Sequence, residues 1–129
     1  MLEIKNSCLV IVDVQGKLAQ LMHDKEELFR NLEVLARSAN MLDIKILVCR
    51  QNPKALGDVI DELLPHLDGI EPGDKFVFSC CGSGEFNGQL EAAGVKNVIL
   101  CGIESHICVM QTAIDLIDKG YAVHVIADA

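Results

Sequence analysis

The stretch CLVIVDV, residues 8–14, decides the fold of this chain. Its apolar residues follow one another without polar alternation, which is typical of a parallel strand that is covered on both faces. Four further apolar runs rich in Val, Ile and Phe have the same character. We therefore expect five strands, over residues 8–14, 45–49, 76–79, 97–101 and 122–127.

Helical patterns separate these apolar runs, and this alternation is typical of a doubly wound α/β domain. An apolar stripe at helical spacing predicts a helix over residues 25–42. Three further helices are expected over residues 55–64, 86–93 and 105–119. Right-handed crossovers then give one domain, residues 1–129, with a mainly parallel sheet of order 3-2-1-4-5 and helices on both faces.

The composition argues against several classes of protein. Half of the 129 residues are hydrophobic, as in a globular chain. The net charge of −8 argues against partners such as nucleic acid or an anionic membrane, because both need basic patches. No apolar run is long enough to cross a membrane, and Glu3 lies where a signal peptide would carry positive charge. We therefore expect a cytoplasmic protein.

The six cysteines are expected to be reduced, mostly structural thiols. Cys8, Cys49 and Cys101 lie in apolar runs, where a free cysteine packs as a small hydrophobe. Cys80 and Cys81 are adjacent, which is poor geometry for a bridge between them. The chain has no CxxC motif and no histidine pair at ligand spacing, so we expect no metal and no cofactor.

Three chemically active side chains fall near the carboxyl ends of predicted strands, where sites form in open α/β sheets. Asp13 interrupts the most apolar strand, Lys75 precedes the third, and Cys108 lies at the start of the helix after the fourth. Each alone has an ordinary structural explanation: a cap, a solvated lysine and core packing. Together they suggest a thiol whose pKa is lowered by a helix start and an ammonium, with a carboxylate that moves its proton.

Two other features leave alternatives open. Gln15, just beyond Asp13, either faces a substrate pocket or caps a turn. The loop CGSGEFNG, residues 81–88, lies between a strand and a helix as a phosphate-binding loop does, but its glycine spacing departs from the dinucleotide fingerprint. We interpret this loop as a pocket wall.

The segments VIVDVQ (10–15), DKFVFS (74–79) and CGIESHICVMQTAIDLIDKGYAVHVIADA (101–129) resemble the isochorismatase-like cysteine hydrolase superfamily. The chain is more similar to the small isochorismatase-domain proteins than to the nicotinamidases. The resemblance implies that Cys108 is the nucleophile, Asp13 the general acid/base, and Lys75 the charge that holds thiolate and carboxylate in place.

The same resemblance implies a cis peptide at Ile103–Glu104 and an oxyanion hole made by the backbone amides of Glu104 and Cys108. The metal motif of the nicotinamidases is replaced by CRQNPKALG at residues 49–57, so no metal is implied. The family's sixth strand and last helix have no counterpart within residues 1–129, and we expect them to lie beyond Ala129. Members of the family are commonly homo-oligomers, and we expect one here.

The sequence thus predicts a cysteine-dependent hydrolase of a small molecule, acting at an amide C–N bond. Hydrolysis of an ether such as isochorismate is the alternative within the family. A scaffold of the same fold without activity is the third possibility, and occupation of all three positions, Asp13, Lys75 and Cys108, counts against it.

Overall fold

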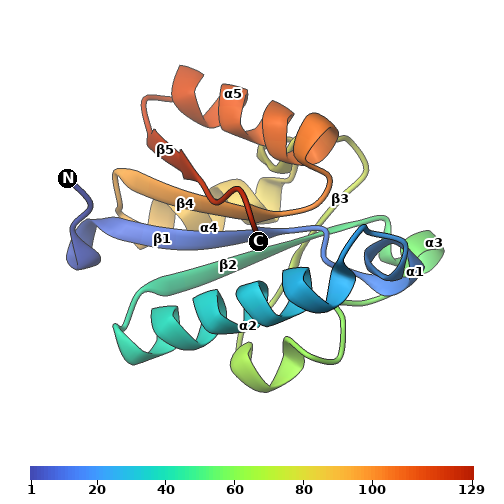
Figure 1. Ribbon diagram of the computed structural model, residues 1–129. Helices are drawn as coiled ribbons and strands as arrows, with labels where there is room; N and C mark the ends of the chain where they lie inside the picture. Colours follow the sequence, from blue (N-terminus) through green and yellow to red (C-terminus); the bar gives the residue numbers. More distant parts are fainter.

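A five-stranded, all-parallel sheet runs through the middle of the computed structural model, which describes residues 1–129 (Figure 1). Its strands are β1 (Ser7–Val12), β2 (Lys45–Gln51), β3 (Gly73–Lys75), β4 (Asn97–Gly102) and β5 (Ala122–Val125). The strand order is β3-β2-β1-β4-β5, and each neighbouring pair is parallel. The predicted α/β class and strand order are therefore confirmed.

Helices cover both faces of this sheet. The α-helices are α1 (Gly16–Gln20), α2 (Lys25–Met41), α3 (Pro53–Leu56), α4 (Gly84–Ala93) and α5 (Met110–Asp118). Three short 3-10 turns are η1 (Ile4–Asn6), η2 (Leu64–His66) and η3 (Cys80–Gly82), and the π-helical turn η4 (Ser105–Val109) precedes α5. In Figure 1, α2 lies on one face, with α4 and α5 on the other. No helix is long and apolar enough to span a membrane.

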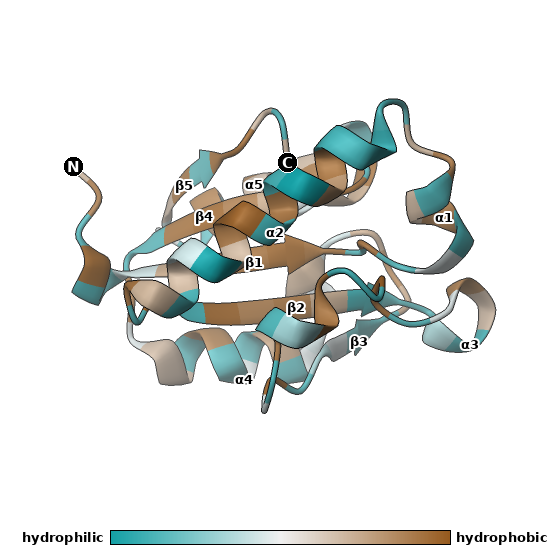
Figure 2. Ribbon diagram, turned by 60° about the horizontal axis from the view of Figure 1, so that its bottom comes forward, coloured by the Kyte–Doolittle hydropathy of each residue, from teal (hydrophilic) through white to brown (hydrophobic).

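The central strand β1 serves two cores, which explains its uninterrupted apolar run. Alternate side chains of a strand point to opposite faces of the sheet. Because both faces are covered, all residues of β1 are buried. Leu9 and Ile11 pack with Leu32 of α2 on one face. On the other face, Val10 packs in a cluster that includes Phe86 of α4. The hydrophobic colouring along β1 and β2 in Figure 2 follows this arrangement.

The predicted third strand, over residues 76–79, is wrong. The strand that pairs with β2 is β3, and its last registered pair is Gln51 with Lys75. Beyond Gln51, Pro53 begins α3, so β2 offers no further edge with which residues 76–79 could pair. The apolar run is instead a loop, and Phe76 is 72% exposed.

The predicted helix over residues 55–64 is also wrong. Helix α3 ends at Leu56, because Gly57 adopts a φ of 88°. The chain then runs antiparallel beside residues 14–16, just after β1: the Gly16 N–H donates to Asp58 O at 2.9 Å, and the Ile60 N–H donates to Val14 O at 3.1 Å. Val59, Ile60 and Leu63 of this segment pack on the core from irregular backbone, and their spacing imitates a helix.

Two turns at the carboxyl edge of the sheet place the polar side chains. Strand β1 ends at Val12, and Asp13 takes a φ of 52°, a left-handed conformation that aspartate tolerates better than most residues. The predicted helix over residues 105–119 begins as the π-helical turn η4 and becomes α-helical at Met110. Asp13 and η4 therefore follow the adjacent strands β1 and β4.

Candidate active site

A buried ion pair forms the centre of the candidate site. Lys75 Nζ lies 2.8 Å from Asp13 Oδ2, and the two side chains are 0% and 1% exposed. They are 62 residues apart in the chain, one at the end of β3 and the other in the turn after β1. Removing two charges from water costs free energy that their attraction must offset, so such a pair is weak evidence for stability alone. A buried, perturbed pair at a strand end is typical of a functional site.

The Lys75 ammonium has an acceptor for each of its three N–H groups. Besides Asp13, it donates to Gln51 Oε1 at 2.7 Å and to the carbonyl oxygen of Val77 at 3.2 Å. Burial by itself lowers the pKa of Lys75, but the hydrogen bond and charge of Asp13 outweigh it, and the pKa lies above its ordinary value. Lys75 is therefore a fixed positive charge at neutral pH.

The Cys108 thiol completes the cluster from η4. Its residue is 9% exposed, and its pKa is shifted by both Asp13 and Lys75, so the three groups lie within mutual reach. Asp13 Oδ1 is buried and makes no hydrogen bond of good geometry, which leaves it available as a proton acceptor. The structure thus brings together the three side chains that the sequence singled out.

The expected low pKa of Cys108 is wrong. Burial first, and then the Asp13 carboxylate, raise the pKa of the thiol to about 11, while Lys75 only partly opposes them. Burial also raises the pKa of the Asp13 carboxyl, with Lys75 acting in the opposite direction. The thiol at rest is therefore protonated, and a nucleophilic role requires a neighbouring base to remove its proton during the attack.

The turn between β4 and η4 has the geometry that the sequence resemblance implied. The Ile103–Glu104 peptide bond is cis, which confirms that expectation. The Glu104 carbonyl oxygen accepts hydrogen bonds from the N–H groups of Ile107 at 3.1 Å and Val109 at 3.2 Å. An oxyanion hole formed by the backbone amides of Glu104 and Cys108 stays a prediction.

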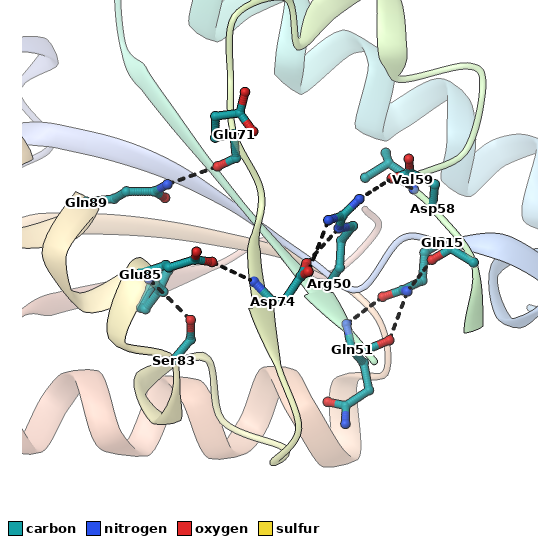
Figure 3. Close-up of polar contacts among 12 residues, drawn as sticks. Gln15, Arg50, Gln51, Asp58, Val59, Glu71, Asp74, Ser83, Glu85 and Gln89 are labelled. Carbon is teal, nitrogen blue, oxygen red and sulfur yellow. Dashed lines mark hydrogen bonds and ion pairs between the residues drawn. The ribbon is translucent and has the colours of Figure 1, made fainter. Parts of the chain in front are cut away.

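Gln15 is fully buried, and protein groups occupy its amide. Its Nε2 donates to the carbonyl oxygens of Gln51 at 3.0 Å and Gly57 at 2.7 Å, and its Oε1 accepts from the Gln51 N–H at 2.7 Å. Figure 3 shows this two-sided contact with the Gln51 backbone. Of the two roles considered for Gln15, the geometry favours the stabilisation of turns over contact with a substrate.

Arg50 fixes the short strand β3 to β2 beside the site. Its guanidinium donates to Asp74 at 2.8 and 3.2 Å and to Asp58 at 2.9 Å (Figure 3). The Asp74 carboxylate is the main cause that raises the pKa of Arg50. Arg50 and Asp74 are registered partners, and the next pair along is Gln51 with Lys75. Gln51 therefore lies opposite Lys75. Gln51 was not identified from the sequence, in which its only signal is its place near a strand end.

Two pockets lie beside the Asp13, Lys75 and Cys108 side chains. A pocket of about 700 Å³ is lined by residues 102–106, by residues 125–129 and by the start of α2. Another, of about 600 Å³, lies between residues 76–79 and α5. Neither is lined by Asp13, Lys75 or Cys108. No group of three or more His, Cys, Asp or Glu side chains is placed to hold a metal ion.

Comparison with known proteins identifies the family. Residues 7–129 match the isochorismatase domain family, and the chain belongs to it. Isochorismatase domain-containing protein 2 of Xenopus laevis is 33% identical over 126 residues, which cover 97% of this chain and 60% of that protein. The secreted isochorismatase effector Isc1 of Phytophthora sojae is 33% identical over 128 residues, 96% of this chain and 61% of the effector.

The solved structures agree with the fold. The MAR1 ribonuclease from Caenorhabditis elegans superposes with a TM-score of 0.92 at 36% identity, covering 99% of this chain and 66% of that one. This chain spans about 60% of the length of the Xenopus relative described above.

Proposed function

We propose that this chain carries the catalytic residues of a hydrolase that acts on a small molecule through a cysteine nucleophile, at an amide C–N bond. The observation that supports this most is the buried Asp13–Lys75 pair beside the Cys108 thiol, with one carboxylate oxygen left unpaired. Membership of the isochorismatase domain family is consistent with a hydrolase.

In this proposal Asp13 is the base that the protonated thiol requires. As Cys108 Sγ bonds to the carbonyl carbon of the amide, the thiol proton passes to Asp13, and the carbonyl oxygen becomes negative. The Lys75 ammonium stabilises the developing negative charge, together with the predicted backbone amides of Glu104 and Cys108. The C–N bond then breaks, Asp13 returns the proton to the leaving nitrogen, and a thioester remains on Cys108.

Water completes the cycle through the same groups. Asp13 takes a proton from the water that attacks the thioester, the C–S bond breaks, and the carboxylic acid leaves as the thiol regains its proton. The raised pKa of the Asp13 carboxyl suits a group that must both accept and return a proton.

The test is a hydrolysis screen of the full chain on three substrate classes: small aliphatic and aromatic amides, enol ethers of the isochorismate type, and RNA. RNA is included because the Caenorhabditis relative is named a ribonuclease, although the net charge of −8 of this chain disfavours binding to a polyanion. The variants are Cys108→Ala and, as a matched control, Cys101→Ala.

We expect amide hydrolysis by the wild type and by Cys101→Ala, none by Cys108→Ala, and an acyl adduct on Cys108 in mass spectra of the wild type. Amide hydrolysis that survives in Cys108→Ala would overturn the nucleophile assignment. Activity confined to the ethers would keep the family and reject the amide bond as target.

A further inference from the structure

We propose that Gln51 is a positioning residue that fixes the Lys75 ammonium beside Asp13 through a neutral acceptor. The inference rests on the proposed function, because it assigns Gln51 a task only if Lys75 and Cys108 do chemistry. The sequence marks Gln51 only by its place near a strand end, and its role follows from the contacts that it makes.

The first support is the hydrogen bonding of Lys75. An ammonium has three N–H donors in a fixed tetrahedral arrangement, so three acceptors determine where Nζ lies. Gln51 Oε1, at 2.7 Å, is as near as Asp13 Oδ2, at 2.8 Å, whereas the Val77 carbonyl oxygen is farther, at 3.2 Å. Gln51 and Lys75 are also registered partners in the β2–β3 ladder, so neighbouring backbones carry both ends of this hydrogen bond.

The second support is that Gln51 is itself held at the backbone. The amide of Gln15 contacts both the N–H and the carbonyl oxygen of Gln51, at 2.7 and 3.0 Å. Gln15 is fully buried, and Figure 3 shows its amide facing the backbone of Gln51. Through the contacts from Gln15 to Gln51 and from Gln51 to Lys75, the neighbouring strand β2 fixes the ammonium of β3.

The third support is the charge balance around Lys75. The titratable groups that face it are Asp13 after β1, Cys49 within β2, Cys80 in η3 and Cys108 in η4. Asp13 is the one carboxylate among them, so the pair is electrically balanced before the thiol loses its proton. The neutral side-chain amide of Gln51 accepts one of the other two Lys75 N–H groups. It adds no second negative charge, and such a charge would oppose the formation of a thiolate at Cys108.

The test is the rate of Cys108 alkylation by iodoacetamide across a pH series, resolved by residue with mass spectrometry. Gln51→Met removes the acceptor at similar volume, and Gln51→Glu keeps the reach but adds a charge. We expect each variant to lower the alkylation rate at neutral pH about tenfold and to move the profile to higher pH, because charged hydrogen bonds of this kind are worth about one pKa unit or more.

The matched control is Gln20→Met. Gln20 Oε1 accepts from Lys25 Nζ at 2.9 Å on the surface, so the control breaks the same kind of hydrogen bond outside the site. Its profile should equal that of the wild type. An unchanged Cys108 profile in either Gln51 variant, even with reduced thermal stability, overturns the positioning role while leaving the proposed function intact. If wild-type Cys108 reacts no faster than Cys101, the proposed function fails first.

Discussion

Cys101 and Cys108 lie on either side of the turn after β4, and the two sites differ in what surrounds the thiol. In the strand interior, the Cys101 thiol packs in the core and donates a hydrogen bond to the carbonyl oxygen of Val10 at 3.5 Å, and burial alone raises its pKa to about 12. Beyond the strand end, burial and the Asp13 carboxylate raise the pKa of Cys108 to about 11, and the charge of Lys75 acts in the opposite direction.

This comparison shows that the resting pKa does not separate Cys108, the proposed nucleophile, from the packing thiol Cys101. Both thiols are protonated at neutral pH. What distinguishes the strand end is the Asp13 carboxylate and the Lys75 ammonium beside the thiol, to which we assign the roles of base and stabilising cation in our proposal. The predictions that follow test this difference, from the largest expected effect to the smallest.

Among single substitutions at a fixed pH, the largest effect on stability is expected at the ion pair itself. Lys75→Met should lower the free energy of unfolding by about 3–5 kcal/mol, because it leaves the Asp13 carboxylate buried without its partner. Chemical denaturation near neutral pH measures the change. Lys25→Met, whose ammonium has a surface contact, should change it by no more than about 0.5 kcal/mol. A loss below about 1 kcal/mol in Lys75→Met would show that the pair is not buried as described.

The strand-interior thiols predict a loss of stability in alkali. Cys8 and Cys101 have pKa values raised by burial from 9.0 to about 12. Above pH 9 the unfolded chain loses these protons and the folded chain keeps them, so the free energy of unfolding should fall by about 1.4 kcal/mol per pH unit for each thiol. The fall continues until the folded pKa is reached. Denaturation at several alkaline pH values measures the slope, and Cys101→Ala should reduce it; an equal slope in that variant would contradict the assignment.

A smaller effect is expected when the strand-interior thiol is truncated. Cys101→Ala removes a small buried group and should lower the free energy of unfolding by about 1–2 kcal/mol. Because Cys101 does not belong to the Asp13–Lys75 cluster, the Cys108 alkylation rate should stay as in the wild type. A changed rate would mean that the two sites are coupled through β4.

The sheet could be predicted from the sequence because each central strand is buried on both faces and reads as an apolar run. The errors fell where apolar residues are not part of a regular element. Residues 76–79 carry two phenylalanines in an exposed loop, and residues 55–64 bury loop side chains at a helix-like spacing. In both places the backbone conformation depends on tertiary contacts, which the local sequence pattern does not reveal.

The candidate site was predictable in its members and not in its electrostatics. Asp13, Lys75 and Cys108 stand out as polar or reactive residues beside apolar strands, and the structure brings them together. The predicted direction of the Cys108 pKa shift was wrong, because the burial that raises this pKa depends on the packing of the whole fold. Gln51 was missed because a glutamine near a strand end has no distinctive pattern. The homo-oligomer, the cytoplasmic location, and the absence of metal and cofactor stay predictions.

The central claim is that Asp13 accepts the proton of Cys108, and the pH profile of Cys108 alkylation in Asp13→Asn tests it most directly. The Asp13 carboxylate raises the pKa of the thiol, and asparagine keeps an acceptor for Lys75 without the negative charge. The account predicts that the profile of Asp13→Asn moves to lower pH and that amide hydrolysis is lost in the same variant. Amide hydrolysis that persists in Asp13→Asn would contradict the role of Asp13 as proton acceptor, and a profile that stays in place or moves to higher pH would contradict the effect of its charge on the thiol.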